Sequence, residues 1–578
     1  MERKFILFLI LFIISHPTLA IVAPTTSPQE PNFKINEATI DSVQTAIKRH
    51  QITCEQLIKE YINRIKNYNL SVNSKPPINA ITQINPYVYQ EAQQLDAIYS
   101  TTQQLVGSLH CIPVLVKDNI SSYDVNTTAG SYALLGNQPN QDAFLVSQLR
   151  KAGAIILGNA SMDEFAWGMY GISSRNGRTG NAYDTSKNPG GSSGGSAVAV
   201  SANFTMIGIG TDNSGSVRIP AAFNGIFGLR PSTGLISQRG LFPMGNLDGV
   251  AGPLTRSVKD LALVLNVIAQ PDSDDKKTMN IPRVKTYMDF LKENGLQGKR
   301  IGIVHHVGKI DTYTAMPQNV KDIFSNFNQR LHQLGATIID NVDLPNFDNN
   351  RKNNMAGQTQ DVNKYLASFP ATRKNFRDIC ESDRTRTFGT VRQCLSFIKS
   401  NSKKLDSKYQ QVLSIFKKNK NYVEQIMKTN HLDVLLIPIS TQGSASYDPL
   451  TINPWQAAVS SNAGLPSIVL NAGYLNNMPV GVELIGKMFD EGTLIEIAYS
   501  YEKNSPQRID PISPEENKQF STLSISKLNN LFTLIGKFSY ENVLQSGKTG
   551  VQVSEMLTPE IFRKLVQDQL LEYQSSNL

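Results

Sequence analysis

The chain has 578 residues, of which 40% are hydrophobic and 18% charged, a composition that is ordinary for a globular protein with a large core. Its 56 Lys and Arg residues exceed its 48 Asp and Glu residues, which gives a net charge of +8. The excess is spread along the chain apart from a lysine-rich run between Lys399 and Lys420. Because such a run is typical of a solvated helical face, we expect no nucleic-acid partner.

The first 34 residues have the pattern of an export signal followed by a flexible lead. Residues 1–4 are MERK, residues 5–14 carry no charge, and residues 18–20 are the small-residue sequence TLA. We therefore expect a signal peptide over residues 1–20, cleaved after Ala20, and a secreted or periplasmic protein. The apolar run is shorter than the roughly 20 residues that span a bilayer, so no stable membrane anchor is expected. Residues 21–34 are rich in Pro and Ser and are predicted to be unstructured.

Two segments before residue 120 have clear structural patterns. Residues 53–56 (TCEQ) fit a capping box, and the apolar residues that follow recur at helical spacing, which predicts an amphipathic helix. Residues 112–116 are a short apolar run that predicts a buried strand, and the run ends abruptly at Lys117. A lysine in this place either reaches out to solvent along its aliphatic stem or has a function.

Residues 187–235 are the most informative stretch, because two loops rich in Gly and Ser flank an apolar segment. The glycines allow close approach of the backbone to a ligand, while Ser192, Ser193 and Ser196 supply hydroxyl groups. A phosphate-binding P-loop needs a lysine where Ser196 stands, and a dinucleotide-binding loop needs a glycine where Asn213 stands. A nucleophile elbow must follow a hydrophobic strand, whereas residues 183–189 are polar. All three of these interpretations are disfavoured.

The second half of the chain is mostly helical in pattern up to residue 430. Residues 300–304 are predicted as a strand, and residues 462–486 as two strands around a turn. Residues 558–560 (TPE) predict the start of a helix near the C-terminus. Its apolar stripe is expected either to pack on the preceding domain or to form a homodimer contact, and consists of Ile561, Phe562, Leu565, Val566, Leu570 and Leu571.

The chain has an even number of cysteines, as expected for a disulfide-bonded exported protein. A disulfide between Cys380 and Cys394 is plausible because the loop between them is short. Pairing of Cys54 with Cys111 is left open. Neither a CxxC nor an HExxH motif is present. The adjacent histidines His305 and His306 have no acidic residues near them at the spacing of a metal site. We therefore expect no metal and no cofactor.

Taken as a whole, residues 187–235 resemble the amidase signature family, which are serine hydrolases of amides. The family's GGSSGGS loop is present at residues 190–196, its GTD motif with GS, R and PA at residues 210–222, and its NG and GLKP-like segments at residues 224–231. Ser214 stands where the family usually has glycine. Residues 111–118 (CIPVLVKD) resemble the family's GIPV-x-x-KD motif, with Cys111 in place of the glycine.

The resemblance covers roughly residues 35–505 and implies an α/β fold in which a mixed central β-sheet is flanked by helices. The catalytic domain is then expected over residues 35–510. Residues 511–578 have no counterpart in the family and are predicted to be a helical extension. Residues 310–430, where the resemblance is thin, are expected to shape substrate access.

The resemblance also implies the roles of the site residues. Ser216 corresponds to the nucleophile, Lys117 to the base, and Ser192, after a cis bond from Gly191, to the serine that bridges them. A lysine acts as a base only when neutral, which burial favours by lowering its pKa. The oxyanion hole would consist of the backbone N–H groups of Asn213, Ser214, Gly215 and Ser216. The supporting residues would be Ser193, Asp212 and Arg218, although a purely structural ion pair is the alternative for the last two.

The implied activity is hydrolysis of a carboxamide to an acid and ammonia. Residues 224–225, 234–237 and 360–366 resemble peptide amidases, which favours C-terminal peptide amides as substrates. Aryl or fatty acyl amides are the alternative substrates within the family. A non-catalytic binding protein on this fold, or a subunit like that of the tRNA amidotransferase, would be a different function, but the export signal argues against a subunit that works on cytoplasmic tRNA.

Overall fold

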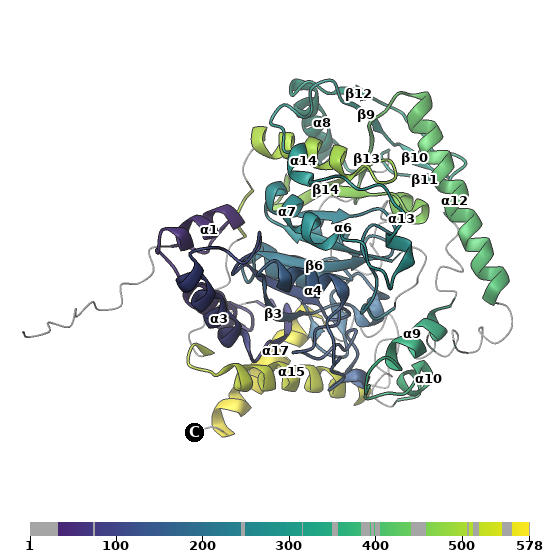
Figure 1. Ribbon diagram of the computed structural model, residues 1–578. Coiled ribbons are helices and arrows are strands. Elements are labelled where there is room, and N and C mark those ends of the chain that lie inside the picture. Colours follow the sequence, from purple (N-terminus) through teal and green to yellow (C-terminus); the bar gives the residue numbers. More distant parts are fainter. Residues whose placement is uncertain are drawn as a thin grey trace, which may run out of the picture.

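The computed structural model describes most of the chain, and one large sheet runs through the middle of it with helices packed around it (Figure 1). The described residues are 33–72, 75–243, 249–314, 316–349, 357–382, 394, 398, 405–440, 458–505, 508–511, 520–545 and 558–576. The expected signal peptide and residues 399–404 of the lysine-rich run lie outside them. None of the described helices combines the length and the apolar character needed to cross a membrane.

The central sheet has 11 strands in the order β1-β3-β2-β6-β8-β7-β14-β15-β13-β9-β12. It is mixed, because β2 pairs in parallel with β3 and β6 whereas β8 is antiparallel to β6 and β7. The predicted α/β fold with a mixed sheet is therefore confirmed. The strands are β1 (Ile81–Ile84), β2 (Pro113–Lys117), β3 (Ile155–Ala160), β6 (Ile207–Asp212), β7 (Phe227–Arg230), β8 (Val250–Thr255), β9 (Arg300–Ile303), β12 (Thr337–Ile339), β13 (Val434–Pro438), β14 (Ser467–Leu475) and β15 (Met478–Ile485).

The strands at the centre are mostly apolar and are buried along their whole length, because both faces of the sheet are covered. Every residue of β2, β3 and β6 is buried. The predicted strand over residues 112–116 is β2, and the predictions at residues 300–304 and 462–486 correspond to β9 and to the β14–β15 hairpin. Two small hairpins lie outside this sheet, β4 (Ile172–Ser173) with β5 (Gly177–Arg178), and β10 (His306–Val307) with β11 (Ile310–Asp311).

The helices begin and end largely where local chemistry requires. Thr53 and Gln56 form the predicted capping box at the start of α2, each side chain binding the other's backbone N–H. The α-helices are α1 (Ile40–Lys48), α2 (Cys54–Tyr68), α3 (Val88–Thr102), α4 (Phe144–Lys151), α5 (Gly194–Ser201), α6 (Arg218–Phe223), α7 (Val258–Ile268), α8 (Gln318–Gln333), α9 (Gln358–Leu366), α10 (Phe376–Cys380), α12 (Leu405–Thr429), α13 (Ala458–Ala463), α14 (Glu491–Asn504), α15 (Ile525–Gln545) and α17 (Pro559–Ser576).

The C-terminal extension forms α15 and α17, which pack side by side at the bottom of the view in Figure 1. Asn529 of α15 binds both backbone groups of Ile84 in β1, with two hydrogen bonds of 2.8 Å. Phe562 and Val566 of α17 are fully buried, so this face packs on the same chain as expected. The predicted stripe was too wide, because Ile561 and Leu571 are 48% and 62% exposed. Successive residues of a helix are separated by about 100°, so both fall outside the packed face.

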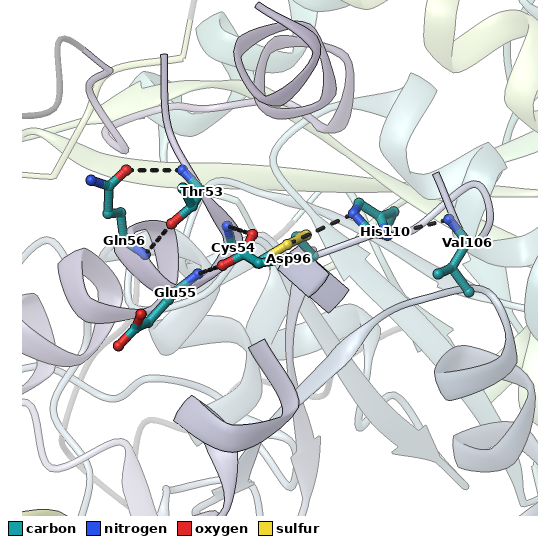
Figure 2. Close-up of a disulfide and its surroundings, with 8 residues drawn as sticks. Thr53, Cys54, Glu55, Gln56, Asp96, Val106 and His110 are labelled. Carbon is teal, nitrogen blue, oxygen red and sulfur yellow. Dashed lines mark hydrogen bonds between the residues drawn. A yellow bond between two sulfur atoms is a disulfide. The ribbon is translucent and has the colours of Figure 1, made fainter. Parts of the chain in front are cut away.

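Both cysteine pairs form disulfides, and Figure 2 shows the surroundings of the one between Cys54 and Cys111. This bond joins the first residue of α2 to the segment before β2, across a sequence separation of 57 residues. The carboxylate of Asp96 accepts the N–H groups of Cys54 and Glu55 at 2.7 and 3.0 Å, which fixes the start of the helix. The Cys380–Cys394 disulfide starts from the last residue of α10 and agrees with the expectation from the short loop.

Cys54, Cys111 and His110 lie within 4.8 Å of one another and form a group of potential metal ligands. The sulfur atoms are bonded to each other, whereas a metal needs thiolates. Nδ1 of His110 accepts the N–H of Val106 at 3.3 Å, so the proton of the neutral ring is on Nε2, which faces Cys54 Sγ at 3.7 Å (Figure 2). The donor chemistry of this group therefore fits a buried disulfide with a packed histidine rather than a metal site.

The histidine pair does have acidic partners, contrary to the expectation from sequence. His305 Nε2 lies 2.7 Å from Asp340 Oδ1, and His306 Nδ1 lies 3.0 Å from Asp343 Oδ1. The carboxylates come from a segment 35 to 37 residues away, which a local pattern does not reveal. Each histidine is bound to its own carboxylate, so the contacts are two separate pairs.

Candidate active site

Lys117 is the last residue of β2, and its side chain is fully buried. Its Nζ donates hydrogen bonds to Ser192 Oγ at 2.7 Å, to Thr211 Oγ1 at 2.9 Å and to the carbonyl of Thr211 at 3.3 Å. Because β2 lies between the parallel strands β3 and β6, the amine is placed where the carboxyl ends of three strands meet. That edge of an open α/β sheet is a common place for a ligand site.

The electrostatic environment of Lys117 favours a neutral amine. Burial lowers the pKa of Lys117 to about 7, because the ammonium ion loses its hydration there. The carboxylates of Asp163 and Asp212 act in the opposite direction but do not outweigh burial. A large fraction of the amine is therefore neutral near pH 7, and a neutral amine can accept a proton from a bound hydroxyl group.

Ser192 lies in the first glycine-rich loop, directly before α5. The peptide bond between Gly191 and Ser192 is cis, as the resemblance implied, and the serine side chain is fully buried. Gly190 has a φ of 74°, and a Cβ at this residue would lie 2.7 Å from Cα of Pro220. Only glycine therefore allows this loop to approach α6 so closely.

Ser193 joins the two serine-bearing loops. Its hydroxyl group donates to the carbonyl of Thr211 at 3.1 Å and accepts the N–H of the same residue at 3.2 Å. Its backbone N–H donates to the carbonyl of Ser216 at 3.1 Å. Ser216, which is 7% exposed, is thereby held beside the loop that carries Ser192. Within the described part of the chain, no hydrogen bond joins the hydroxyl group of Ser192 to that of Ser216. Contacts between catalytic groups often tighten only when substrate binds.

Asp212 and Arg218 form a buried ion pair behind Ser216. Arg218 donates Nε to Oδ2 and Nη2 to Oδ1 of the carboxylate, both at 2.9 Å, and Arg230 Nη1 donates to Oδ1 at 2.9 Å. The remaining arm of Arg218 binds Glu483 Oε1 at 2.6 Å. Burial alone would raise the pKa of Asp212, but the two guanidinium groups outweigh it and hold that pKa well below its usual range.

Residues 56–495 match the family model described as Amidase. The chain belongs to the amidase family. It is 31% identical over 490 residues to a glutamyl-tRNA(Gln) amidotransferase subunit of Caldanaerobacter subterraneus subsp. tengcongensis, with 82% of this chain and 97% of that protein covered. It is also 31% identical over 508 residues to a probable amidase of Arabidopsis thaliana, covering 82% of this chain and 90% of the relative.

Solved structures give the same family assignment. The peptide amidase of Stenotrophomonas maltophilia has a TM-score of 0.74 and 30% identity, covering 82% of this chain and 99% of that one. The corresponding glutamyl-tRNA(Gln) amidotransferase subunit from Thermotoga maritima has a TM-score of 0.61 and 26% identity, covering 84% and 99%. The chain is thus an amide-hydrolysing enzyme of the amidase family, and the sequence resemblance is confirmed.

In the loop after Asp212, one of the expected oxyanion donors, the N–H of Gly215, binds a side chain of the protein. The N–H of Gly215 donates to Asp212 Oδ1 at 2.9 Å, and the N–H of Val217 donates to Oδ2 at 3.0 Å. Gly215 is therefore committed to holding the turn, because its N–H is directed at the carboxylate. The other oxyanion donors expected from the sequence are the backbone N–H groups at Asn213, Ser214 and Ser216.

Four residues that contact this site were missed by the sequence analysis, namely Thr211, Arg230, Glu483 and Asp163. Thr211 and Arg230 lay within motifs that were recognised, but the motifs do not say which side chains meet. Glu483 had a local signal, because it is a lone carboxylate in the fully buried strand β15. Asp163 follows β3 and had only a weak signal in a segment that resembles the family.

Proposed function

We propose that this chain is an exported amidase that hydrolyses a carboxamide to a carboxylic acid and ammonia through Lys117, Ser192 and Ser216. The contact that carries the proposal is the 2.7 Å hydrogen bond between Lys117 Nζ and Ser192 Oγ, which joins a buried amine to a buried hydroxyl group. Ser216 is the more accessible serine and lies beside them. Proton transfer to a buried base through a hydroxyl group activates an otherwise weak nucleophile.

The proposed reaction has two halves. Ser216 Oγ attacks the amide carbonyl carbon while its proton passes to Ser192 Oγ, and the proton of Ser192 passes to Lys117 Nζ. Lys117 then returns a proton through Ser192 to the leaving nitrogen, so that ammonia departs and an ester to Ser216 remains. Water then attacks this ester by the same proton route, which releases the acid and restores Ser216.

The negative charge that forms on the carbonyl oxygen needs hydrogen-bond donors in place before the reaction. We assign this role to the backbone N–H groups at Asn213, Ser214 and Ser216, because Gly215 donates to Asp212. Arg218 and Arg230 keep Asp212 ionised, so its carboxylate continues to accept the N–H groups of the turn. The ion pair thus supports the turn that carries the nucleophile.

We favour C-terminal peptide amides as substrates. The similarity in structure is greater to a peptide amidase, with a TM-score of 0.74, than to the amidotransferase subunit, with 0.61. An N-terminus with the pattern of an export signal also favours a substrate found outside the cytoplasm. Aryl and fatty acyl amides are the competing substrates, because pocket shape decides among them.

The test compares ammonia or amine release from a dipeptide amide, an anilide and a long-chain acyl amide, with the wild-type chain and Ser216→Ala side by side. We expect the dipeptide amide to give the largest kcat/KM and Ser216→Ala to give none. A clear preference for either other substrate would overturn the peptide-amide assignment. Retained turnover in Ser216→Ala would overturn the assignment of Ser216 as the nucleophile. N-terminal sequencing of the exported chain tests cleavage after Ala20.

A further inference from the structure

Asp163 lies just after β3 and is almost fully buried, with 3% of its surface exposed. Its carboxylate accepts backbone N–H groups from the neighbouring loop, at 2.9 Å from Tyr170, 3.1 Å from Gly171 and 3.4 Å from Ile172. Its own N–H donates to the carbonyl of Ser192 at 3.2 Å. One residue therefore fixes two loops, one of which carries the serine bound by Lys117.

The carboxylate also lies directly against the peptide that precedes Ser192. A Cβ on Gly191 would lie 2.0 Å from Asp163 Oδ2, and one on Gly168 would lie 2.4 Å from Oδ1. Because neither glycine has a side chain, there is room for the carboxylate between them. The negative charge is thus held close to the hydrogen bond between Lys117 and Ser192.

Two carboxylates act on Lys117, and they differ in how far their charge is compensated. Asp212 is paired with Arg218 and Arg230, so its charge is largely neutralised where it sits. Asp163 is instead held by uncharged N–H groups. Both oxygens of Asp163 accept N–H groups, as those of an ionised carboxylate do. Burial raises the pKa of Asp163 to about 6, and those N–H groups and Lys117 act in the opposite direction.

Other charged groups nearby are directed elsewhere. Asp118, the next residue after Lys117, accepts hydrogen bonds from Thr128 and Asn159. The positive charge of Arg175 favours its ionised form. Glu164, the next residue after Asp163, accepts the hydroxyl of Ser174 at 2.7 Å. Neither carboxylate contributes to the pKa of Lys117.

We propose that Asp163 is a positioning residue of the amidase site: its buried carboxylate holds the Gly191–Ser192 segment in place and stabilises the ammonium ion that Lys117 becomes when it takes the proton from Ser192. This role rests on the proposed function of Lys117, Ser192 and Ser216. The proton stops at Lys117 Nζ, and Asp163 remains an anion throughout. A buried carboxylate that stabilises a neighbouring cation without being protonated plays a similar part in serine–histidine–aspartate sites.

The test is the pH dependence of labelling of Ser216 by a small fluorophosphonate, which reports activation of the serine without any choice of amide substrate. It compares the wild-type chain with Asp163→Asn and Glu164→Gln. Asp163→Asn should lower the maximal labelling rate about 10-fold and move the acid limb of the profile to lower pH by about one unit, because Lys117 loses the anion that favours its charged form. Glu164→Gln removes the adjacent buried carboxylate and should leave both values unchanged.

A role limited to holding the loops would lower the rate without moving the acid limb. An acid limb in Asp163→Asn at the wild-type pH, or at higher pH, would therefore overturn the proposal while leaving the proposed function intact. Wild-type protein that fails to label at Ser216 would instead overturn the proposed function, and this role with it. If thermal melting shows that Asp163→Asn does not fold, Asp163→Ser, which is smaller and keeps an oxygen acceptor, is measured in its place with the same expected shift.

Discussion

Thr211 Oγ1 accepts a hydrogen bond from Lys117 Nζ at 2.9 Å. The same oxygen accepts a bond from Asn119 Nδ2 at 3.0 Å, so the threonine side chain is fixed by two donors. The carbonyl of Thr211 binds the hydroxyl of Ser193 and also the lysine. Thr211 thus aims the amine at Ser192 and connects it to both serine-bearing loops.

Thr211→Val keeps the shape of this side chain but removes its hydroxyl group. We expect kcat/KM on the best amide to fall about 10- to 100-fold, because the amine loses one of the contacts that orient it. Thr211→Ser retains the hydroxyl and should stay within about 3-fold of the wild type. Wild-type kinetics in the valine variant would show that the amine is oriented without this oxygen.

The three proposed catalytic residues should differ in the size of their effects. Ser216→Ala should abolish covalent labelling, and Lys117→Ala should cost about three decades of kcat or more, because the nucleophile then has no base. Ser193→Ala should cost less, since its hydroxyl binds the backbone of Thr211 and not Lys117 or Ser192 within the described residues. Steady-state kinetics on a dipeptide amide measures this order. Ser196→Ala is the control, because its hydroxyl binds the carbonyl of Ile209 away from the triad.

The pH dependence of kcat/KM should show an acid limb near pH 7. Burial lowers the pKa of Lys117 to about 7, and the lysine accepts a proton only after losing its own. Activity should therefore be low at pH 5, rise through pH 7 and reach a plateau above pH 8. A profile that keeps rising towards pH 10 would mean that the amine has the pKa of an exposed lysine.

Glu483→Ala should destabilise the fold strongly. Glu483 and Asp212 bind opposite sides of Arg218, and all three side chains are fully buried. Removing one carboxylate leaves part of a buried cation unpaired, which costs about 3–5 kcal/mol of unfolding free energy. The matched control is Glu381→Ala, which breaks an exposed pair with Arg377 and should cost less than about 0.5 kcal/mol. Urea unfolding of both variants measures the difference, and equal losses would contradict the assignment.

The sequence was sufficient to predict the local elements and to single out Lys117. The strand β2 was visible as an apolar run, and Lys117 was conspicuous because a charged residue ended it. The capping box at Thr53 and the strand pairs at β14 and β15 were also set by residues close together in the chain. In each case the interaction that decides the structure spans only a few residues.

Most of the parts that were missed depend on contacts between distant segments, and one depends on the conformation of a turn. Arg218 meets Glu483 across 265 residues, so neither residue indicates the other in the sequence. The N–H of Gly215 belongs to an oxyanion-hole motif, yet it donates to Asp212 because the turn brings that carboxylate back under it. The exposure of Ile561 and Leu571 likewise depends on which face of α17 the rest of the chain covers. The domain boundary near residue 510 stays a prediction.

The contact between Asn529 and Ile84 has a consequence for the outer edge of the sheet. β1 is the terminal strand on its side, and an uncovered terminal strand offers its backbone groups to strands of other chains. The amide side chain of Asn529 takes both the N–H and the carbonyl of Ile84, as a neighbouring strand would. α15 thus closes the sheet at this position with a helix instead of a strand. A chain ending before residue 525 would present that edge to its neighbours and would be prone to self-association through it.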